Sequence, residues 1–588
     1  MKKILLLASL ISLFLIDFKA NAQVVCFVTD PSVVRGSYDI GVPVSAWGFD
    51  IDTMAAVGQL KLMRSVGGIA GGDSLGCDTI LANASEIAGK IAVVYRGSCE
   101  FGLKALAAQN NGAIGLIIIN NSPTMINLAG ATYGMRINIP LVMISDADGA
   151  LLRPYIDDDS TVAIIGQKRG QFDNDLGFTI GDLIRPMDWA VPANQVVNPG
   201  DYVFKLGANV RNYGKDPQTN LNLNIQIDFT DSAGNTSTVY NQSGTSALLA
   251  VDSEVVITLA DFDPHSQGKG RYAIRYNITS SNPDDFDADN TNTQIFLLSD
   301  SLYSKVRLDS LGIPFRSGGY RPTDASSGPY EYGVLFYTGP HGHLMQVNSL
   351  RFGFVTNVGT NLINETVVGK VSRWDDFNMN GIMDPGELNE IGEGFYTYTD
   401  SLGSGDIREV AIEDIASGRR GVLLDSNAIY MFHLAYTGAS TEVFTSVDPN
   451  TDYTFSSQFH QPQRVAPVFV TAWNSNGFGP EFVPAIAAVI GANTVSVENK
   501  LRNDLNIRVY PNPVRDELNI RLTAEDHIGR LNYEVLDISG RVVMRGQEMV
   551  DGFSHQSQIS VGQLQQGVYT LVLNTNKGFN TSRFVISR

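Results

Sequence analysis

The sequence contains few of the residues that most often carry out chemistry in enzymes. It has 3 cysteines and 7 histidines in 588 residues, and no His-Glu-x-x-His string that would hold a catalytic zinc ion. It also lacks a glycine-rich loop followed by Lys-Ser or Lys-Thr, the motif that cradles nucleotide phosphates. These absences argue against a zinc protease and against a P-loop nucleotide-binding protein.

Positive charge and long apolar runs are also scarce. The chain has 42 Lys and Arg against 61 Asp and Glu, for a net charge of −19. Such a surface repels phosphate backbones, so we expect no nucleic-acid partner. The apolar run 4–16, preceded by two lysines and followed by Ala20 and Ala22, predicts a signal peptide over residues 1–22. That run is too short to span a bilayer, and we expect no transmembrane segment.

Strand and turn patterns dominate the rest of the chain. Residues 176–300 alternate apolar and polar side chains, for example from Leu221 to Ile227, and so predict an antiparallel β-sandwich that resembles immunoglobulin-like domains. Residues 301–495 predict a larger β-sandwich of jelly-roll kind. Its many aromatic residues are expected in the core, with a carbohydrate-stacking face as the alternative. The fold class predicted is mainly β and multidomain.

The N-terminal part differs, because strand and helix patterns alternate there. Apolar strands are predicted at 89–97, 114–119 and 139–145, with a short helix at 100–111. Strand, helix and strand joined by short connections predict parallel strands with a right-handed crossover.

Several short strings in this part are similar to those of the protease-associated (PA) domain. They are Gly76-Cys77, Gly89-Lys90-Ile91, Arg96 to Phe101, Lys104, Gly112-Ala113 and Ile139-Pro140. The resemblance implies a non-catalytic α/β sandwich lid over residues 23–168 that binds peptides or regulates access to a neighbouring active site. Residues 168–175 follow as a polar linker.

The three cysteines allow at most one disulfide bond. Cys77 and Cys99 flank one predicted strand and are the favoured pair, while Cys26 is left free. A bridge closing a loop of this length contributes about 3 kcal/mol to the free energy of unfolding. The alternative is three buried, reduced thiols.

The last part of the chain carries separated strand motifs in a fixed order. They are Val509 to Pro513, Leu518 to Ile520, Leu536 to Val543, Gly567 to Leu573 and Arg583 to Ile586. Together they resemble the type A C-terminal sorting domain of cargo for the Bacteroidetes type IX secretion system, over residues 503–588. The resemblance implies a β-sandwich domain, an interaction with that secretion machinery, and a secreted or outer-membrane surface location.

One segment has the spacing of a calcium-binding loop, Asp-x-Asn-x-Asn-Gly followed by five residues and Glu. Hard cations take oxygen ligands, and alternate side chains of such a loop converge on one ion, with a backbone carbonyl among them. The loop resembles those of EF-hands and dockerins, although a strand rather than a helix is predicted before it. The alternative is a hairpin with an Asn-Gly turn. The predicted ligands are Asp376, Asn378, Asn380, Ile382, Asp384 and Glu387.

Other motifs favour ordinary structure. The string Gly-Asp-Ser-Leu-Gly at 72–76 matches an esterase motif, but no histidine and acid pattern accompanies it, so turn glycines explain it better. His341 and His343 lie in a Pro/Gly turn and are expected to be exposed. The acidic loop 284–289 is expected to be solvated, with cation binding as its alternative.

The sequence therefore predicts a non-catalytic protein that binds an extracellular peptide, protein or glycan, with structural calcium as its cofactor. The main alternative is a secreted hydrolase, a peptidase, with its active site in residues 310–495. Such a hydrolase would place His433, His460 or the pair His341 and His343 beside carboxylates in a cleft. A structural spacer would show neither a binding groove nor such a cluster.

Overall fold

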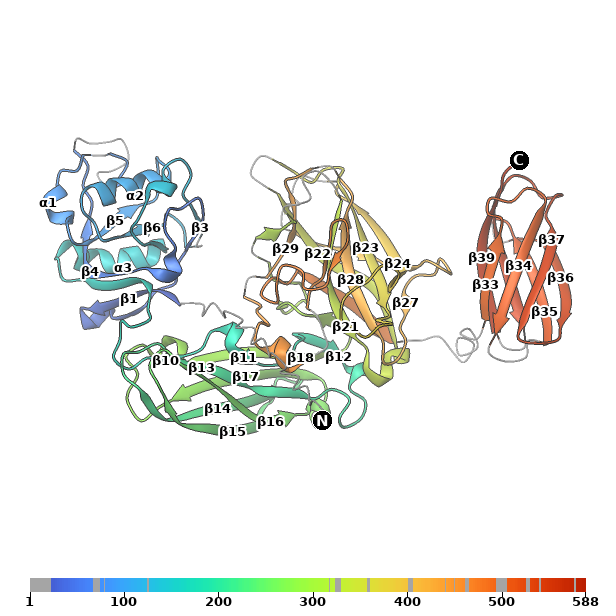
Figure 1. Cartoon of the computed structure of the whole chain (residues 1–588), viewed down its shortest axis with the longest axis horizontal. Coiled ribbons are helices and arrows are strands. Elements are labelled where there is room, and N and C mark those ends of the chain that lie inside the picture. The colour runs from blue at the N-terminus through green and yellow to red at the C-terminus, as the bar shows by residue number, and fades with distance from the viewer. Residues whose placement is uncertain are drawn as a thin grey trace, which may run out of the picture.

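The computed structural model describes residues 23–66, 74–78, 80–123, 126–316, 318–322, 329–356, 360–399, 406–438, 440–448, 450–460, 465–492, 505–524, 529–538, 541–575 and 578–588. Strands make up 49% and helices 11%, so the predicted mainly β, multidomain class is confirmed (Figure 1). Among the described residues, no helix combines the length and apolarity that a membrane crossing needs. The predicted signal peptide, residues 1–22, lies outside the described residues.

The N-terminal domain is one seven-stranded sheet between helices. The sheet order is β2-β1-β9-β4-β5-β6-β8, and β4, β5, β6 and β8 run parallel. The strands are β1 (Val24–Asp30), β2 (Gly36–Ser37), β4 (Ala55–Leu62), β5 (Ile91–Tyr95), β6 (Gly115–Ile119), β8 (Leu141–Ile144) and β9 (Val162–Gln167). The predicted parallel strands are confirmed. A separate pair, β3 (Pro43–Ser45) and β7 (Leu128–Ala129), lies beside this sheet.

Two hydrophobic cores lie on opposite faces of this sheet, because alternate residues of its buried strands point to opposite sides. Helix α2 (Phe101–Asn110) contributes Leu106 to one core, and α3 (Asp146–Asp157) contributes Leu152 to the other. The predicted helix at 100–111 is thus confirmed. A short helix, α1 (Ala84–Ile87), precedes β5.

A β-sandwich follows from residue 176. One of its sheets has the order β10-β13-β11, with β16 paired to β13; the other begins β15-β14-β17-β18. The strands are β10 (Leu176–Gly177), β11 (Leu183–Ile184), β13 (Phe204–Asn212), β14 (Gln218–Thr230), β15 (Thr236–Leu249), β16 (Glu254–Phe262), β17 (Gly270–Thr279) and β18 (Thr291–Ser299). The alternating residues from Leu221 to Ile227 are fully buried between the sheets, as the period of two predicts.

The second sheet of this sandwich continues into the next unit. It runs from β18 through β12, β19 and β32 to β22, β29 and β20, while β25 and β27 also pair with β22. These strands are β12 (Ala190–Pro192), β19 (Leu302–Ser304), β20 (Gly319–Tyr320), β22 (Met345–Thr356), β25 (Ile407–Ala411), β27 (Val422–Leu423), β29 (Val443–Ser446) and β32 (Ile486–Ala492). A single hydrophobic core extends from Leu176 to Ile490, so neither the sheet nor the core breaks near residue 300.

The other sheet of the larger unit has the order β26-β24-β23-β28-β21-β30-β31. Its strands are β21 (Tyr330–Tyr337), β23 (Thr366–Trp374), β24 (Leu388–Thr397), β26 (Glu413–Asp414), β28 (Ile429–Tyr436), β30 (Val468–Phe469) and β31 (Trp473–Asn474); a short helix, α4 (Ser456–Phe459), lies between β29 and β30. Aromatic residues such as Tyr332 and Phe352 are fully buried, which confirms their expected place in the core.

The C-terminal domain is a small β-sandwich with its own core. Three-stranded and four-stranded sheets have the orders β33-β34-β37 and β36-β35-β38-β39. The strands are β33 (Leu505–Tyr510), β34 (Glu517–Ala524), β35 (Gly529–Leu536), β36 (Val542–Val550), β37 (Ser554–Ser560), β38 (Gly567–Thr575) and β39 (Gly578–Ile586).

One buried cation joins the N-terminal domain to the β-sandwich. Lys168, directly after β9, is fully buried, and its Nζ lies 2.6 Å from Asp175 Oδ1 and 2.6 Å from Asp289 Oδ2. The ammonium group also lies 4.3 Å from the ring centre of Tyr213 and 4.4 Å from that of Phe286. The predicted polar linker therefore buries two of its charges. The acidic loop 284–289, expected to be solvated, contributes Asp289 to this ion pair and buries Phe286.

The buried carboxylates of Asp175 and Asp289 are stabilised because the ammonium group of Lys168 compensates their negative charge. Burial raises the pKa of Asp175 and of Asp289, and the charge of Lys168 opposes that rise. Phe27 of β1 packs on Phe286 and Phe172 at ring-centre distances of 5.2 and 5.4 Å, which adds an apolar contact between the same two domains.

We predict that Lys168→Met lowers the free energy of unfolding of these two domains by about 3–5 kcal/mol, because two buried carboxylates lose their partner. The loss should be larger at pH 8 than at pH 5. An acid whose pKa is raised in the folded state contributes stability at low pH and loses it as the pH rises. Calorimetry across this pH range measures the effect. Lys215→Met is the control, because the Lys215–Asp173 pair is solvent-exposed. Equal melting of the two variants would contradict the prediction.

Candidate functional site

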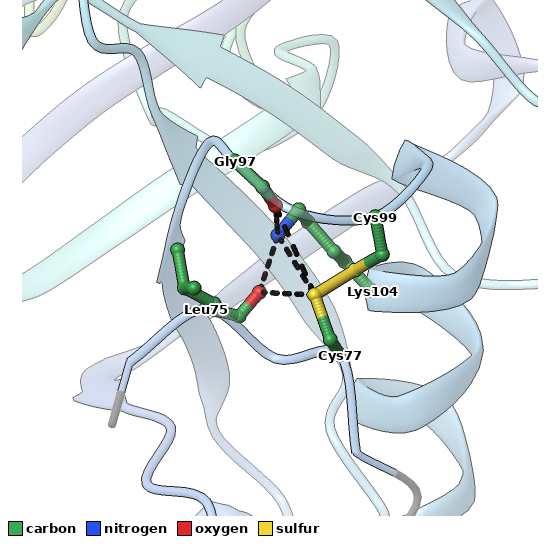
Figure 2. The surroundings of a disulfide bond; sticks show 5 residues. All are labelled: Leu75, Cys77, Gly97, Cys99 and Lys104. Atoms are coloured by element: carbon green, nitrogen blue, oxygen red, sulfur yellow. Dashed lines mark hydrogen bonds between the residues drawn. A yellow bond between two sulfur atoms is a disulfide. The ribbon is translucent and has the colours of Figure 1, made fainter. Parts of the chain in front are cut away.

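The loops at one end of the N-terminal sheet are held by a disulfide bond and a buried lysine (Figure 2). Cys77 and Cys99, the pair that the sequence favours, are bonded, with their Cα atoms 5.9 Å apart. Lys104 of α2 is fully buried and donates hydrogen bonds to the carbonyl oxygens of Leu75 and Gly97, at 2.5 and 2.8 Å. The lysine and the disulfide therefore tie the same two loops together.

These groups support structure rather than chemistry. Burial lowers the pKa of Lys104 to about 8, and both of its short contacts are main-chain carbonyls. Cys26 is free and fully buried in β1, and burial raises the pKa of its thiol to about 12, so it is a poor nucleophile. Ser74 of the esterase-like string is also buried, while residues 72 and 73 lie outside the described residues.

A surface cavity of about 400 Å³ lies on the same domain, beside the edge strand β2. Val33 and Leu151 line it with exposed fractions of 70% and 53%. Arg35 supplies a positive charge, and Asp39 and Asp148 supply negative charges. We call this cavity the edge groove. It combines apolar surface, both signs of charge and the outer edge of β2, with which no strand of the described residues pairs.

The predicted calcium loop connects β23 to β24, so it follows a strand, as expected, and closes a hairpin. Asp376 Oδ2 accepts a hydrogen bond from Gly381 N at 2.8 Å, and Glu387 Oε1 accepts one from Phe377 N at 3.2 Å. Asn378 and Asn380 both donate from Nδ2 to Asp384 Oδ2, at 2.8 and 2.9 Å. Each of the five predicted side-chain ligands is therefore hydrogen-bonded within the loop, and the two amides meet at Asp384.

The fit of a cation to this loop depends on the amides as well as the carboxylates. Within the described residues, no three His, Cys, Asp or Glu side chains are gathered closely enough to hold a metal ion. The oxygens of Asn378 and Asn380 instead accept main-chain hydrogen bonds, and Ile382 N donates to Asn380 Oδ1 at 2.7 Å. The atoms that could hold an ion are all carboxylate, amide or main-chain carbonyl oxygens. Oxygen ligands suit calcium and do not suit a soft metal.

The loop is also anchored to the β-sheet beneath it. Glu387 is 5% exposed, and its Oε2 accepts hydrogen bonds from Trp374 Nε1 at 3.3 Å and from Asp384 N at 3.2 Å. Met383 is buried, and its N donates to Ser475 Oγ at 2.7 Å. Through the bond to Ser475, the loop fixes the segment 473–475, which includes Trp473.

Under that segment lie Ser372, His433 and Glu331, three side chains from adjacent strands that we call the serine chain. The sequence did not reveal this group. Ser372 Oγ lies 2.8 Å from His433 Nε2, and His433 Nδ1 lies 2.7 Å from Glu331 Oε2. Burial alone would raise the pKa of Glu331, but His433 and Lys370 lower it to about 2. A serine, an imidazole and a carboxylate in this order form the arrangement that activates a hydroxyl nucleophile.

This serine chain is closed to solvent. Ser372 and His433 are each 1% exposed, and the ring centre of Trp473 lies 5.6 Å from that of His433. The contact between His433 Nδ1 and Glu331 is short, but its direction departs from that of a hydrogen bond. No sequence spacing marks this group of residues, because three separate strands bring its members together.

The remaining predicted histidines lie apart from the serine chain. His341 Nε2 pairs with Asp201 Oδ2 at 2.9 Å, and His343 Nδ1 contacts Ser426 Oγ at 2.8 Å. His460 lines a separate cavity that Asp188 and Asp201 also line. The hydrolase alternative requires a histidine beside carboxylates in a cleft. His433 contacts Glu331 in a site that is closed to solvent, whereas His460 lines a cavity together with Asp188 and Asp201.

Two family models match this chain. Residues 61–152 match the PA domain, and residues 508–587 match the secretion system C-terminal sorting domain. The chain is therefore a PA-domain protein that carries a type IX sorting domain, as its motifs predicted. The sorting domain indicates Bacteroidetes cargo that is secreted or attached to the outer-membrane surface, and it implies an interaction with the type IX machinery.

Similarity to individual proteins is confined to parts of the chain. Aminopeptidase YwaD of Bacillus subtilis (strain 168) is 29% identical over 109 residues, which cover 17% of this chain and 24% of that protein. An aminopeptidase structure from Aneurinibacillus sp. strain AM-1 matches with 17% identity and a TM-score of 0.19, over 25% of this chain and 31% of that chain. A β-glucuronidase structure from Ruminococcus gnavus matches with 11% identity and a TM-score of 0.14, over 45% and 38%. The chain thus spans about a quarter of the length of the curated relative.

Proposed function

We propose that this exported protein binds extracellular ligands without transforming them, and that its PA domain is the binding module. The observation that carries the proposal is the edge groove. An extended peptide can pair with an unpaired strand edge while its side chains enter neighbouring apolar pockets. Val33 and Leu151 offer such apolar surface, and Arg35 and Asp39 can meet charges of either sign. These features favour a peptide or an extended protein segment over a glycan at this groove.

We predict that the double variant Val33→Asp, Leu151→Asp binds unstructured peptides at least tenfold more weakly than the wild type, because a charge replaces apolar contacts. Fluorescence anisotropy with labelled peptides from digested casein, on the chain from residue 23, measures the affinity. Met135→Asp is the control, since Met135 is 67% exposed in the same domain but does not line the groove. Equal loss in the control, or no binding by the wild type, would reject the proposed groove.

We also propose that the loop 376–387 binds calcium as a structural ion. Asp376, Asp384 and Glu387 would supply carboxylate oxygens, Asn378 and Asn380 amide oxygens, and Ile382 its main-chain carbonyl. What supports this is that Asn378 and Asn380 meet at Asp384, while Asp376 and Glu387 accept main-chain hydrogen bonds from the same loop. The bound ion would supply positive charge that fixes the loop and, through Met383 and Ser475, the segment above Ser372.

We predict that calcium binds with a Kd of about 10⁻⁴ to 10⁻³ M, the range of extracellular modules. At ten times Kd it should add about 1.4 kcal/mol to the free energy of unfolding. Titration followed by calorimetry and by tryptophan fluorescence measures this, since Trp374 contacts Glu387. Asp384→Asn should weaken binding at least tenfold. The exposed Asp300→Asn should not change it. Absence of binding at millimolar calcium would refute the site.

Hydrolysis is the second candidate function, and the serine chain is the observation that favours it. His433 would accept the Ser372 proton as Oγ attacks an acyl carbonyl, and would return that proton to the leaving group. Glu331 would hold the imidazole ring in place. The burial of Ser372 opposes this function, because a substrate reaches Oγ only after the segment carrying Trp473 moves away.

A fluorophosphonate probe separates the two candidate functions, because it reacts only with an activated serine. If the chain is a hydrolase, we predict labelling of Ser372 in the wild type and stronger labelling in Trp473→Ala. Labelling should be lost in Ser372→Ala and retained in Ser349→Ala, a control in which another buried strand serine that contacts a carboxylate is removed. Peptide mapping by mass spectrometry identifies the labelled residue. If neither the wild type nor Trp473→Ala is labelled, the hydrolase function is rejected and ligand binding remains as the proposed function.

A further inference from the structure

A second cavity lies outside the PA domain, where the first β-sandwich meets the larger unit. Its volume is about 370 Å³, within the range of small-molecule sites. It is formed by the start of β13, the connection before it, the end of β21 and the end of α4. Its lining includes Asp188, Gln195, Asp201, Tyr202, Tyr337 and His460.

The two carboxylates of this cavity are already compensated. Asp188 Oδ1 lies 2.8 Å from the Nζ of Lys305, which is fully buried, and Asp188 Oδ2 accepts a hydrogen bond from Tyr202 at 3.1 Å. Asp201 Oδ2 pairs with His341 at 2.9 Å. Because each carboxylate has a cationic or imidazole partner, the cavity has little demand for a cationic ligand. Lys305 is in turn engaged by Asp188, so it offers little to an anion.

Among the residues that the structure describes, two buried polar atoms on the wall of the cavity have no hydrogen-bond partner. Gln195 is 3% exposed, and its Nε2 donates to Tyr337 O at 2.7 Å, which leaves Oε1 unpaired. His460 Nε2 is likewise buried and unpaired, and burial lowers the pKa of this histidine, which favours the neutral ring. An unpaired buried polar group carries a desolvation cost that a hydrogen bond from or to a ligand hydroxyl group removes.

Aromatic rings complete the cavity. Tyr337 is 39% exposed, and Tyr202 and Phe459 are half-buried at the wall. Tyr202 stacks on Phe296 at 5.3 Å, so one ring face is fixed against the sandwich. Aromatic side chains provide rigid apolar surface, while Gln195 and His460 provide fixed hydrogen-bonding groups. A ligand that fits both is uncharged, ring-shaped and rich in hydroxyl groups.

We propose that this cavity binds a neutral sugar ring, with Tyr337 against the ring and with Gln195 and His460 bonded to its hydroxyl groups. The site is separate from the edge groove and does not depend on the function proposed for the PA domain. A cationic sugar gains little from the compensated Asp188 and Asp201, and an anionic sugar gains little from Lys305, because Lys305 is already paired with Asp188.

Saturation-transfer NMR and calorimetry on the chain from residue 23 test the site. The probes are glucose, galactose, mannose and N-acetylglucosamine, with glucosamine and glucuronate as charged arms. At least one neutral sugar should bind more tightly than both charged sugars. Tyr337→Ala and His460→Leu should each weaken that binding at least tenfold, while the edge-groove double variant should leave it unchanged.

Tyr320→Ala is the matched control, because Tyr320 is 37% exposed in the same unit but does not line this cavity. Its sugar affinity should equal that of the wild type. Thermal melting of each variant identifies one that fails to fold, in which case the other cavity variant decides. The proposal is overturned if no neutral sugar binds at 20 mM, if glucosamine or glucuronate binds most tightly, or if the folded cavity variants bind like the control.

Discussion

The burial of the Lys168 ammonium group is the interaction on which the arrangement of the folded body depends. A charge taken out of water is tolerated only where opposite charges and polarisable rings surround it. Here Asp175 comes from the linker itself, and Asp289 and Phe286 come from a loop of the β-sandwich more than a hundred residues later. The PA domain is therefore joined to the sandwich by a specific group of side chains, so its edge groove is presented in a defined position.

The continuous sheet and core provide the second constraint. Strands β12 and β19 bridge the two sandwich units, and the cavity lined by Gln195 and His460 lies where these units meet. Groups held by two packed units keep their geometry better than groups on one loop, which suits a binding site. The same logic applies to the serine chain, whose members lie on three neighbouring strands and whose cover is held by the predicted calcium loop.

Several features were predictable because their determinants are local in the sequence. The strand from Leu221 to Ile227 follows from its period of two, and helix α2 from its position between two apolar strands. The predicted calcium loop follows from the fixed spacing of its motif, and its place after a strand follows from the alternating residues before it. By contrast, Lys168 is one polar residue in a polar segment, and no local pattern distinguishes it from a solvated lysine.

What the sequence alone determined is the mainly β class, the PA and sorting domains, the favoured disulfide and the export of the protein. These depend on side-chain periodicity and on short motifs, which survive without knowledge of long-range contacts. Only the tertiary structure decided which polar residues meet. Ser372 and His433 are 61 residues apart, and Lys168 and Asp289 are 121 apart. Such pairs form because sheet register and domain packing bring distant segments together. The local pattern of side chains predicts neither the register nor the packing.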